Sequence, residues 1–327
     1  MPEARLAGPS TTGPTHGSNS AQFLDAFLNH CKNGTNYVTG KKGTRLDYIT
    51  FHVKGGGFPF HLNPPKQTPS VSSFALQVKT GCEIIKKYDY ENLEVVLSEA
   101  DPDGWAAGGR FDNKNMNFRN TEYYASYIAS SYYNTEKIAK EFNMDVRPLA
   151  WAFMFVAERC FEGTRTFSTQ GINKASFNIF KMYAKMGYEE IDFRCEEFDI
   201  FANPASPEVS GFAAKNEKGG VQVLVYSHHD DWDAKEASTV KLVIEGLADA
   251  EYKVTHYRID DKHSNAYSTW LAEGSPDYPT KEQYEKIKAR DRLETYEPEK
   301  VMIPVDGKLL LEFAMPSHGV SLFDIVL

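Results

Sequence analysis

The sequence is poor in cysteine. Only four occur among its 327 residues, and they lie far apart, at Cys31, Cys82, Cys160 and Cys195. None of the spacings between them is a metal-ligand spacing, such as two cysteines separated by two residues. We therefore expect buried, reduced thiols rather than a metal centre.

An excess of basic residues is also absent, because 36 Lys and Arg stand against 45 Asp and Glu and the formal net charge is -9. A general nucleic-acid binder needs clustered Lys and Arg for its phosphate contacts, so nucleic acid is not an expected partner. No run of eighteen or more apolar residues occurs, which excludes a membrane span. The first twenty residues lack the basic and apolar regions of a secretory signal. The localisation and the oligomeric state stay open.

The sequence has no internal repeat, but it is rich in aromatic residues, which make up 13% of the chain. Carbohydrate sites stack sugars on aromatic rings, and large hydrophobic cores also collect aromatic side chains. Composition alone leaves both explanations open. The length favours two domains, or one large domain with an appendage.

The first half of the chain alternates apolar, strand-like segments with segments of helical periodicity. Four strand–helix units in series predict parallel strands with helical crossovers. A doubly wound sheet and a (β/α)8 barrel both satisfy this pattern, and both place active residues at the carboxyl ends of strands. The expected strands are 4–10, 45–53, 93–98 and 149–156, and the expected helices are 19–32, 70–88, 119–142 and 174–187.

After Gly187 the periodicity changes to short strands separated by turn residues, which is typical of a β-sandwich. We expect a boundary here, between a first domain of residues 1–187 and a sandwich of residues 188–327. One charged helix, over 280–297, interrupts the sandwich, with Thr280 as its N-cap. The expected strands are 198–204, 209–216, 219–229, 238–247, 250–260, 300–308 and 309–327.

Glu99 lies where the third strand leaves the core, in "LEVVLSEADPDGW". A carboxylate on a rigid strand end, with a glycine-loosened loop and Trp105 nearby, suits a nucleophile or a general acid/base. A salt bridge from Glu99 to an arginine is the structural alternative.

Cationic side chains follow two other strands. His52 and Lys54 are two residues apart at the end of the second strand, so both project to one face of it. There they could hold a substrate hydroxyl or a carboxylate, or they could be a core histidine and a solvated lysine. Arg165, in "FEGTRTF" after the fourth strand, could bind a carboxylate or sugar hydroxyls, or form a loop salt bridge.

The segment "SHHDDWD" (227–233) has the composition of a metal site. However, it falls in a predicted hairpin turn, where aspartate is common, and no second set of ligands has convincing spacing. We expect no metal there.

Two motifs, taken together, carry a family resemblance. "RLDYITFHVKGG", followed after about forty residues by "LSEADPDGW", resembles glycoside hydrolase family 39, which includes β-xylosidases and α-L-iduronidases. The downstream "HYRIDDKHSNAYSTWLAEGSPDYPTKEQYEKI" resembles the family's C-terminal sandwich. The resemblance implies a TIM (β/α)8 barrel, of which this chain carries the C-terminal half (strands 5–8), followed by a β-sandwich domain. It also implies retaining hydrolysis of a glycosidic bond without metal or organic cofactor.

The resemblance also implies roles for individual residues. Glu99 matches the catalytic nucleophile at the end of barrel strand seven. His52 and Lys54 match sugar-binding residues at the end of strand six, and Arg165 matches an arginine after strand eight that contacts the sugar. Trp105 is a candidate stacking wall for a sugar ring.

The substrate stays open among a xyloside, a uronide and other pyranosides. The iduronidases carry an aspartate on strand eight, where this chain has the apolar "PLAWAFMF", and this departure weakens an iduronic acid assignment. Lys54 favours an acidic sugar. Phe111 is a second candidate for a stacking wall.

A larger departure is that no Asn-Glu-Pro, the motif of the family's general acid/base, occurs in the sequence. We therefore expect barrel strands one to four to precede Met1, in a protein that is truncated or started late. Such a chain should be weakly stable and essentially inactive by itself. The rival hypothesis is a non-catalytic carbohydrate-binding or scaffold protein of the same fold.

Overall fold

The computed structural model describes residues 3–56, 67–105, 108–202 and 207–327. The chain divides into two compact units. The first contains residues up to Pro59, Pro69–Trp105 and Ser131–Trp151, and the second contains Ala106–Ser130 and the chain from Ala152 to Leu327. The predicted domains, residues 1–187 and 188–327, divide the chain differently from these compact units, and the boundary near residue 187 stays a prediction.

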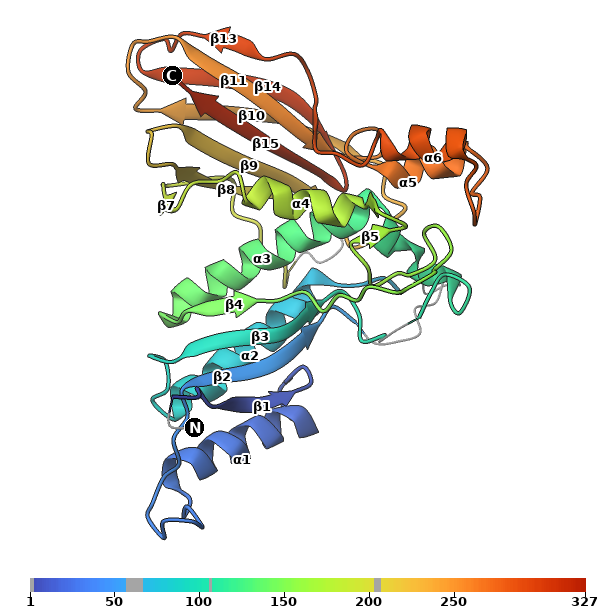
Figure 1. The fold of residues 1–327 in the computed structure, drawn as a ribbon. Helices are drawn as coiled ribbons and strands as arrows, with labels where there is room; N and C mark the ends of the chain where they lie inside the picture. Colours follow the sequence, from blue (N-terminus) through green and yellow to red (C-terminus); the bar gives the residue numbers. More distant parts are fainter. Residues whose placement is uncertain (1–2, 57–66, 106–107, 203–206) are drawn as a thin grey trace. The chain divides into compact units, whose positions relative to one another are not determined.

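The first unit is built on a four-stranded parallel sheet in the order β1-β2-β3-β4 (Figure 1). Neighbouring strands in the sheet are consecutive in the chain, and a helix lies between each strand and the next, as the strand–helix alternation predicted. Within the described residues this sheet is open rather than closed into a barrel. Its elements are β1 (Ala7–Thr11), α1 (Asn19–Asn33), β2 (Tyr48–Lys54), α2 (Val71–Lys87), β3 (Glu94–Asp101), the second half of α3 (Glu122–Phe142) and β4 (Val146–Pro148).

Helix α2 covers one face of β2 because both elements present an apolar surface. Every second residue of β2, from Ile49 through Phe51 to Val53, is fully buried. The buried side chains of α2 include Phe74, Val78, Cys82 and Ile85, the four predicted to point inward. The other face of β2 carries Tyr48, Thr50, His52 and Lys54, so the polar side chains are sorted away from the helix.

The predicted fourth strand, residues 149–156, is wrong. The strand is β4, which begins and ends earlier, and most of the predicted apolar segment is irregular and exposed, with Met154 88% and Val156 97% accessible. The reason lies in β3, which offers a regular backbone ladder only as far as Leu97. Beyond it, the amide of Trp151 donates to the Asp101 carboxylate instead of to a backbone carbonyl.

The second unit contains an antiparallel β-sandwich. Strands β10 and β14 form one sheet, and the other has the order β12-β11-β15-β9-β8-β7, with β13 also paired to β11. One apolar cluster joins them, with Ile244 and Leu309 from the first sheet and Val223 and Phe323 from the second. The strands are β7 (Glu189–Glu190), β8 (Glu208–Lys215), β9 (Val221–His228), β10 (Ala237–Glu245), β11 (Tyr252–Ile259), β12 (Glu294–Thr295), β13 (Lys300–Met302), β14 (Lys308–Pro316) and β15 (Gly319–Val326).

The remaining elements of this unit are short. They are the 3-10 helix η1 (Lys114–Asn120), the first half of α3, β5 (Ser168–Thr169), β6 (Ile172–Asn173), α4 (Ala175–Tyr183), α5 (Ala266–Ala272) and α6 (Lys281–Lys288). Thr280 caps α6 in a full capping box, as expected.

Several predicted boundaries in this unit are wrong. Helix α6 ends near Ala289, not at residue 297, because Glu294 and Thr295 pair with β11. Helix α4 ends at Tyr183, before Gly187, and α5 was not predicted. No strand forms in the described part, 198–202, of the strand predicted over 198–204, and the rest of that segment lies outside the described residues.

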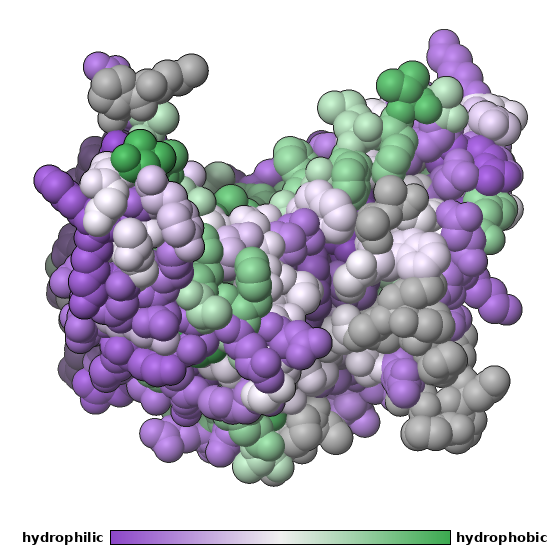
Figure 2. Space-filling view, turned by 90° about the horizontal axis from the view of Figure 1, so that it is seen from below, coloured by the Kyte–Doolittle hydropathy of each residue, from purple (hydrophilic) through white to green (hydrophobic). Residues whose placement is uncertain are grey.

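None of the helices that the structure describes is both long enough and apolar enough to cross a bilayer. On the face drawn in Figure 2, hydrophobic residues form separate patches within a mostly hydrophilic surface. Three cysteines are buried free thiols as expected, whereas Cys195 is exposed, which corrects the prediction for that residue.

Candidate active site at the ends of two parallel strands

The candidate site depends on a β-bulge in β3. Phe51 pairs with Leu97 but His52 pairs with Glu99, so Ser98 is an extra residue without an opposite partner. Val95 and Leu97 are buried on the helix side of the sheet, and a regular strand would send Glu99 to that same side. The extra residue reverses the alternation, so Glu99 shares the face of His52 and Lys54.

The bulge brings three predicted site residues together in the first unit. The ammonium of Lys54 lies 2.8 Å from Glu99 Oε2, and His52 Nδ1 lies 3.4 Å from the same oxygen. The three side chains are only 11%, 18% and 21% exposed for Lys54, Glu99 and His52. Glu99 is therefore paired by a lysine of the neighbouring strand, not by an arginine.

Burial lowers the pKa of His52 below its ordinary value of 6.5, and the nearby Lys54 ammonium lowers it further, against the opposing effect of the Glu99 carboxylate. At neutral pH the ring is therefore mainly uncharged. In a neutral imidazole whose Nδ1 faces a carboxylate, the N–H lies on that nitrogen, and Nε2 is left to accept from a bound hydroxyl group.

Two residues that sequence reasoning missed hold Lys54 in place. Asp101, which is fully buried, accepts a second bond from the Lys54 ammonium at 2.7 Å. Gln77 of α2 bonds to both backbone groups of Lys54, accepting from its N–H at 2.8 Å and donating to its carbonyl at 2.7 Å. The strand end is thus fixed from the sheet side and from the helix side.

Trp151 completes the surroundings of the lysine. Its ring centroid lies 5.2 Å from the Lys54 ammonium, and its backbone N–H donates to Asp101 Oδ1 at 3.2 Å. A cation near an aromatic face is attracted by the ring quadrupole. Asp101 therefore positions both the ammonium and the ring beside it.

A cavity of about 420 Å³ opens at this end of the sheet. It is lined by residues that follow β1, by Lys54 and Gly56 after β2, by Gln77 and its neighbours on α2, and by Gly104 after β3. Its place at the carboxyl ends of parallel strands is the one expected for a ligand site. The lysine is the member of the trio that lines it.

The other predicted site residues lie elsewhere. Trp105 ends the first unit and is half-buried, and its backbone N–H donates to Asp103 Oδ1 at 2.8 Å. Arg165 belongs to the second unit and is almost fully buried there. Phe111 is 49% exposed, and the guanidinium of Arg159 lies 3.5 Å from its ring centroid. The sugar contacts of Trp105, Arg165 and Phe111 stay predictions.

The segment 227–233 contacts helix α3 and contains a local turn bond. His228 Nδ1 is 2.9 Å from Ser126 Oγ, and the N–H of Asp233 donates to Asp231 Oδ1 at 2.9 Å. Among the described residues, no group of three or more His, Cys, Asp and Glu is placed to hold a metal.

The sequence contains a pattern that indicates a role for Asp101. Glu99 and Asp101 are two residues apart, the same spacing as His52 and Lys54 on the neighbouring strand. Two acidic residues on one strand can therefore lie opposite two basic residues on the neighbouring strand and pair with them. Gln77 and Trp151 carry no such signal, because helix packing and a side-chain bond bring them to the site.

The chain matches a known protein family over most of its length. Residues 2–308 match the family described as glycosyl hydrolases family 39. This chain belongs to glycosyl hydrolases family 39. Members of the family are O-glycosyl hydrolases, and the resemblance inferred from the two strand-end motifs is confirmed.

This family-39 chain has distant relatives of known activity. It is 22% identical to an α-L-iduronidase of Mus musculus over 96% of its own length and 50% of the relative's. It is 26% identical to a β-xylosidase of Caldicellulosiruptor saccharolyticus over 42% of its length and 28% of the relative's. The chain spans about half the length of the first of these relatives, and less of the second.

Two solved structures share the fold of the family-39 chain. A bacterial orthologue of human α-L-iduronidase matches with a TM-score of 0.79 at 20% identity, over 98% of this chain and 55% of the other. A monomeric β-xylosidase from Caulobacter crescentus CB15 matches with a TM-score of 0.74 at 19% identity, over 99% and 62%.

Proposed function

We propose that this chain carries the nucleophile of a retaining O-glycosidase and that the nucleophile is Glu99. The observation that supports the proposal is the trio on the bulged strand end, in which Lys54 and His52 approach one oxygen of Glu99. We further propose that β1 to β4 correspond to strands 5–8 of the (β/α)8 barrel.

In this mechanism the Glu99 carboxylate attacks the anomeric carbon of a pyranoside and the bond to the leaving oxygen breaks. A second carboxyl group protonates that oxygen, and water later hydrolyses the glycosyl–enzyme ester, which restores Glu99. The second group must lie about 5–5.5 Å from Glu99. The sequence has no Asn-Glu-Pro motif to supply it, so we assign the second role to none of the described residues.

Lys54 and His52 orient the sugar in this proposal. Lys54 has three N–H donors, and two of them are directed at Glu99 and Asp101. The third remains for a hydroxyl or a carboxylate of the substrate. A xyloside and a uronide both meet this requirement, and we propose Arg165 and Trp105 as further sugar contacts.

The test is covalent labelling with activated 2-deoxy-2-fluoro glycosides, one xyloside and one uronide, followed by peptide mass spectrometry. The fluorine slows hydrolysis of the ester, so the sugar should stay attached to the peptide that contains Glu99. Glu99→Gln should remove the label. Glu83→Gln, at a half-buried carboxylate of α2, is the matched control and should leave labelling unchanged.

A label on another residue would overturn the nucleophile assignment. The absence of the Asn-Glu-Pro motif favours a second candidate, a non-catalytic carbohydrate-binding or scaffold protein. That candidate predicts reversible binding of the unmodified glycoside without a label on Glu99.

A further inference from the structure

The second unit contains a cavity that the proposed chemistry does not use. It measures about 610 Å³. It is lined by residues 262–263, residue 290 and residues 292–295. The first segment follows β11 and the second follows α6. We call it the basic cavity, because three of its lining residues are Lys262, Arg290 and Arg292.

The basic cavity carries an excess of positive charge in a chain whose net charge is negative. Glu294 is the single carboxylate in its lining, and it is already bonded to the N–H of Ser264 at 2.6 Å and to Arg290 at 3.0 Å. Within the part of the chain that the structure describes, the Lys262 ammonium and the Arg292 guanidinium have no ion-pair partner. Two cations are thus available to a ligand.

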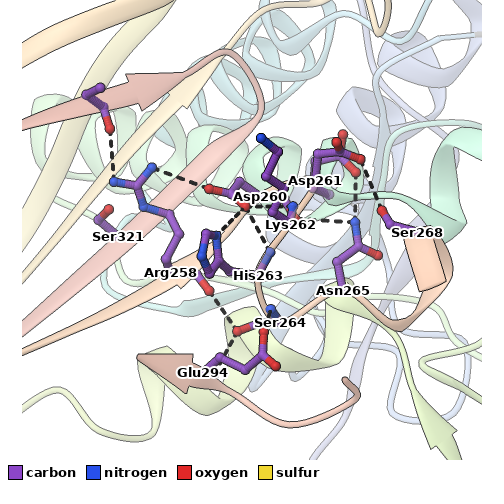
Figure 3. A network of polar contacts seen from close by, with 12 residues as sticks. Arg258, Asp260, Asp261, Lys262, His263, Ser264, Asn265, Ser268, Glu294 and Ser321 are labelled. Carbon is purple, nitrogen blue, oxygen red and sulfur yellow. Dashed lines mark hydrogen bonds and ion pairs between the residues drawn. The ribbon is translucent and has the colours of Figure 1, made fainter. Parts of the chain in front are cut away.

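The wall made by residues 260–265 is preorganised (Figure 3). Asp260 Oδ1 accepts from the N–H groups of Lys262 and His263 at 2.8 and 2.9 Å, and it lies 2.8 Å from His263 Nδ1. Because the carboxylate fixes the Nδ1 side of the ring, Nε2 of His263 is the nitrogen that remains for a ligand.

The two walls are also tied to each other. Ser264 and Glu294 bond reciprocally, since Ser264 Oγ accepts from the Glu294 N–H at 2.8 Å while Glu294 accepts from the Ser264 N–H. Arg290 donates to the carbonyl of Lys262. A site whose walls are fixed before binding loses little entropy when a ligand enters.

We propose that the basic cavity binds an organic oxyanion of about the size of a monosaccharide, such as a uronate. Two free cations recognise the charged group, and Nε2 of His263 accepts from a hydroxyl of the ligand. The volume lies within the roughly 300–1,000 Å³ of small-molecule sites, so it suits an organic molecule better than a bare inorganic ion. The side chain of Leu293 adds an apolar surface for the body of the ligand.

The experiment is calorimetric titration of the full chain at low ionic strength with methyl β-D-glucuronide. The matched neutral probe is methyl β-D-glucoside, and the inorganic probe is sulfate. Glucuronide should bind, and K262Q/R292Q should weaken it about tenfold or more, because two charged hydrogen-bond donors are lost. K218Q/K253Q, two exposed lysines of the same unit with the same change in net charge, should bind like the unaltered chain.

Circular dichroism should show that both double variants are folded, since all four altered side chains are exposed. Equal affinity for glucuronide and glucoside would overturn the proposal, and so would unchanged binding in K262Q/R292Q. If sulfate binds as tightly as glucuronide, the claim that the ligand is an organic molecule is overturned. The readout does not involve Glu99, so it is independent of the proposed hydrolysis.

Discussion

Asp101 is the buried residue of the candidate site whose substitution should destabilise the fold. It is fully buried and shares the Lys54 ammonium with Glu99. A buried charge that loses its partner is strongly destabilised, whereas an exposed ion pair contributes little because water and salt screen it. The same chemical change should therefore have different effects at the two kinds of position.

We expect Asp101→Asn to lower the free energy of unfolding by about 2 kcal/mol, measured by urea denaturation, because a buried hydrogen bond between two charged groups is lost while Lys54 keeps Glu99 as a partner. The control is Asp25→Asn, which removes one charge from the exposed pair of Asp25 with Lys87 and should cost less than about 1 kcal/mol. Similar losses at the two positions would contradict the assignment of Asp101 as a positioning residue.

His256 makes the sandwich sensitive to acid. Burial lowers its pKa from 6.5 to about 3, and the nearby Arg258 acts in the same direction. Between these values the unfolded chain binds a proton that the folded chain does not, so stability is lost as the pH falls from about 6.5 toward 3. The loss approaches about 1.4 kcal/mol per pH unit.

We expect His256→Gln to flatten the dependence of the unfolding free energy on pH between 6.5 and 4. Glutamine keeps a polar group near Ser321 Oγ, which lies 2.9 Å from His256 Nε2, but it does not titrate. His16→Gln, at an exposed histidine, should leave the slope unchanged. An identical slope in His256→Gln and the unaltered protein would show that another group causes the acid sensitivity.

At the scale of the element, the contact between α2 and β2 depends on one glycine. A Cβ atom at Gly81 would lie 2.3 Å from Cζ of Phe51, whose ring is fully buried. Alanine in a helix interior is favoured over glycine by about 1 kcal/mol. Overpacking of a tight core costs about 1–3 kcal/mol, so the steric cost of the added methyl group should exceed the helix preference for alanine.

We expect Gly81→Ala to destabilise the first unit by up to about 2 kcal/mol. Thermal unfolding followed by circular dichroism measures this. Phe51→Leu removes the ring that obstructs the new methyl group, so the double variant should be more stable than the sum of the two single changes predicts. Simple additivity would mean that the backbone, not the ring, accommodates alanine.

The bulge at Ser98 is the feature of β3 that places Glu99 beside His52 and Lys54. A strand with regular alternation would place Glu99 with Val95 and Leu97 against the helices. The period of the apolar residues predicted the strand but could not reveal the extra residue, because a bulge is defined by pairing with β2.

At the scale of the whole molecule, the parallel sheet has two end strands, β1 and β4, among the described residues. End strands present unpaired backbone groups that can bind another chain. Together with the missing Asn-Glu-Pro motif, this predicts a protein of low stability, prone to association, with little turnover of glycosides. Sedimentation velocity over a range of concentrations, thermal unfolding and a xyloside assay measure the three properties. A monomer of ordinary two-state stability with xylosidase-like turnover would contradict all of them.

The sequence by itself determined the order of strands and helices in the first half, the presence of a sandwich in the second half and the family. Each of these depends on local periodicity or on short motifs, which are properties of neighbouring residues. It also placed His52 and Lys54 on one face of a strand.

Only the tertiary structure decided the side to which Glu99 points, the pairing of Lys54 with Asp101, and the end of the fourth strand before the apolar residues 149–156. The physical reason is the same in each case. Strand register, side-chain ion pairs and the end of a ladder are set by partners distant in the chain, such as Phe51 opposite Leu97 and Asp101 beside Trp151.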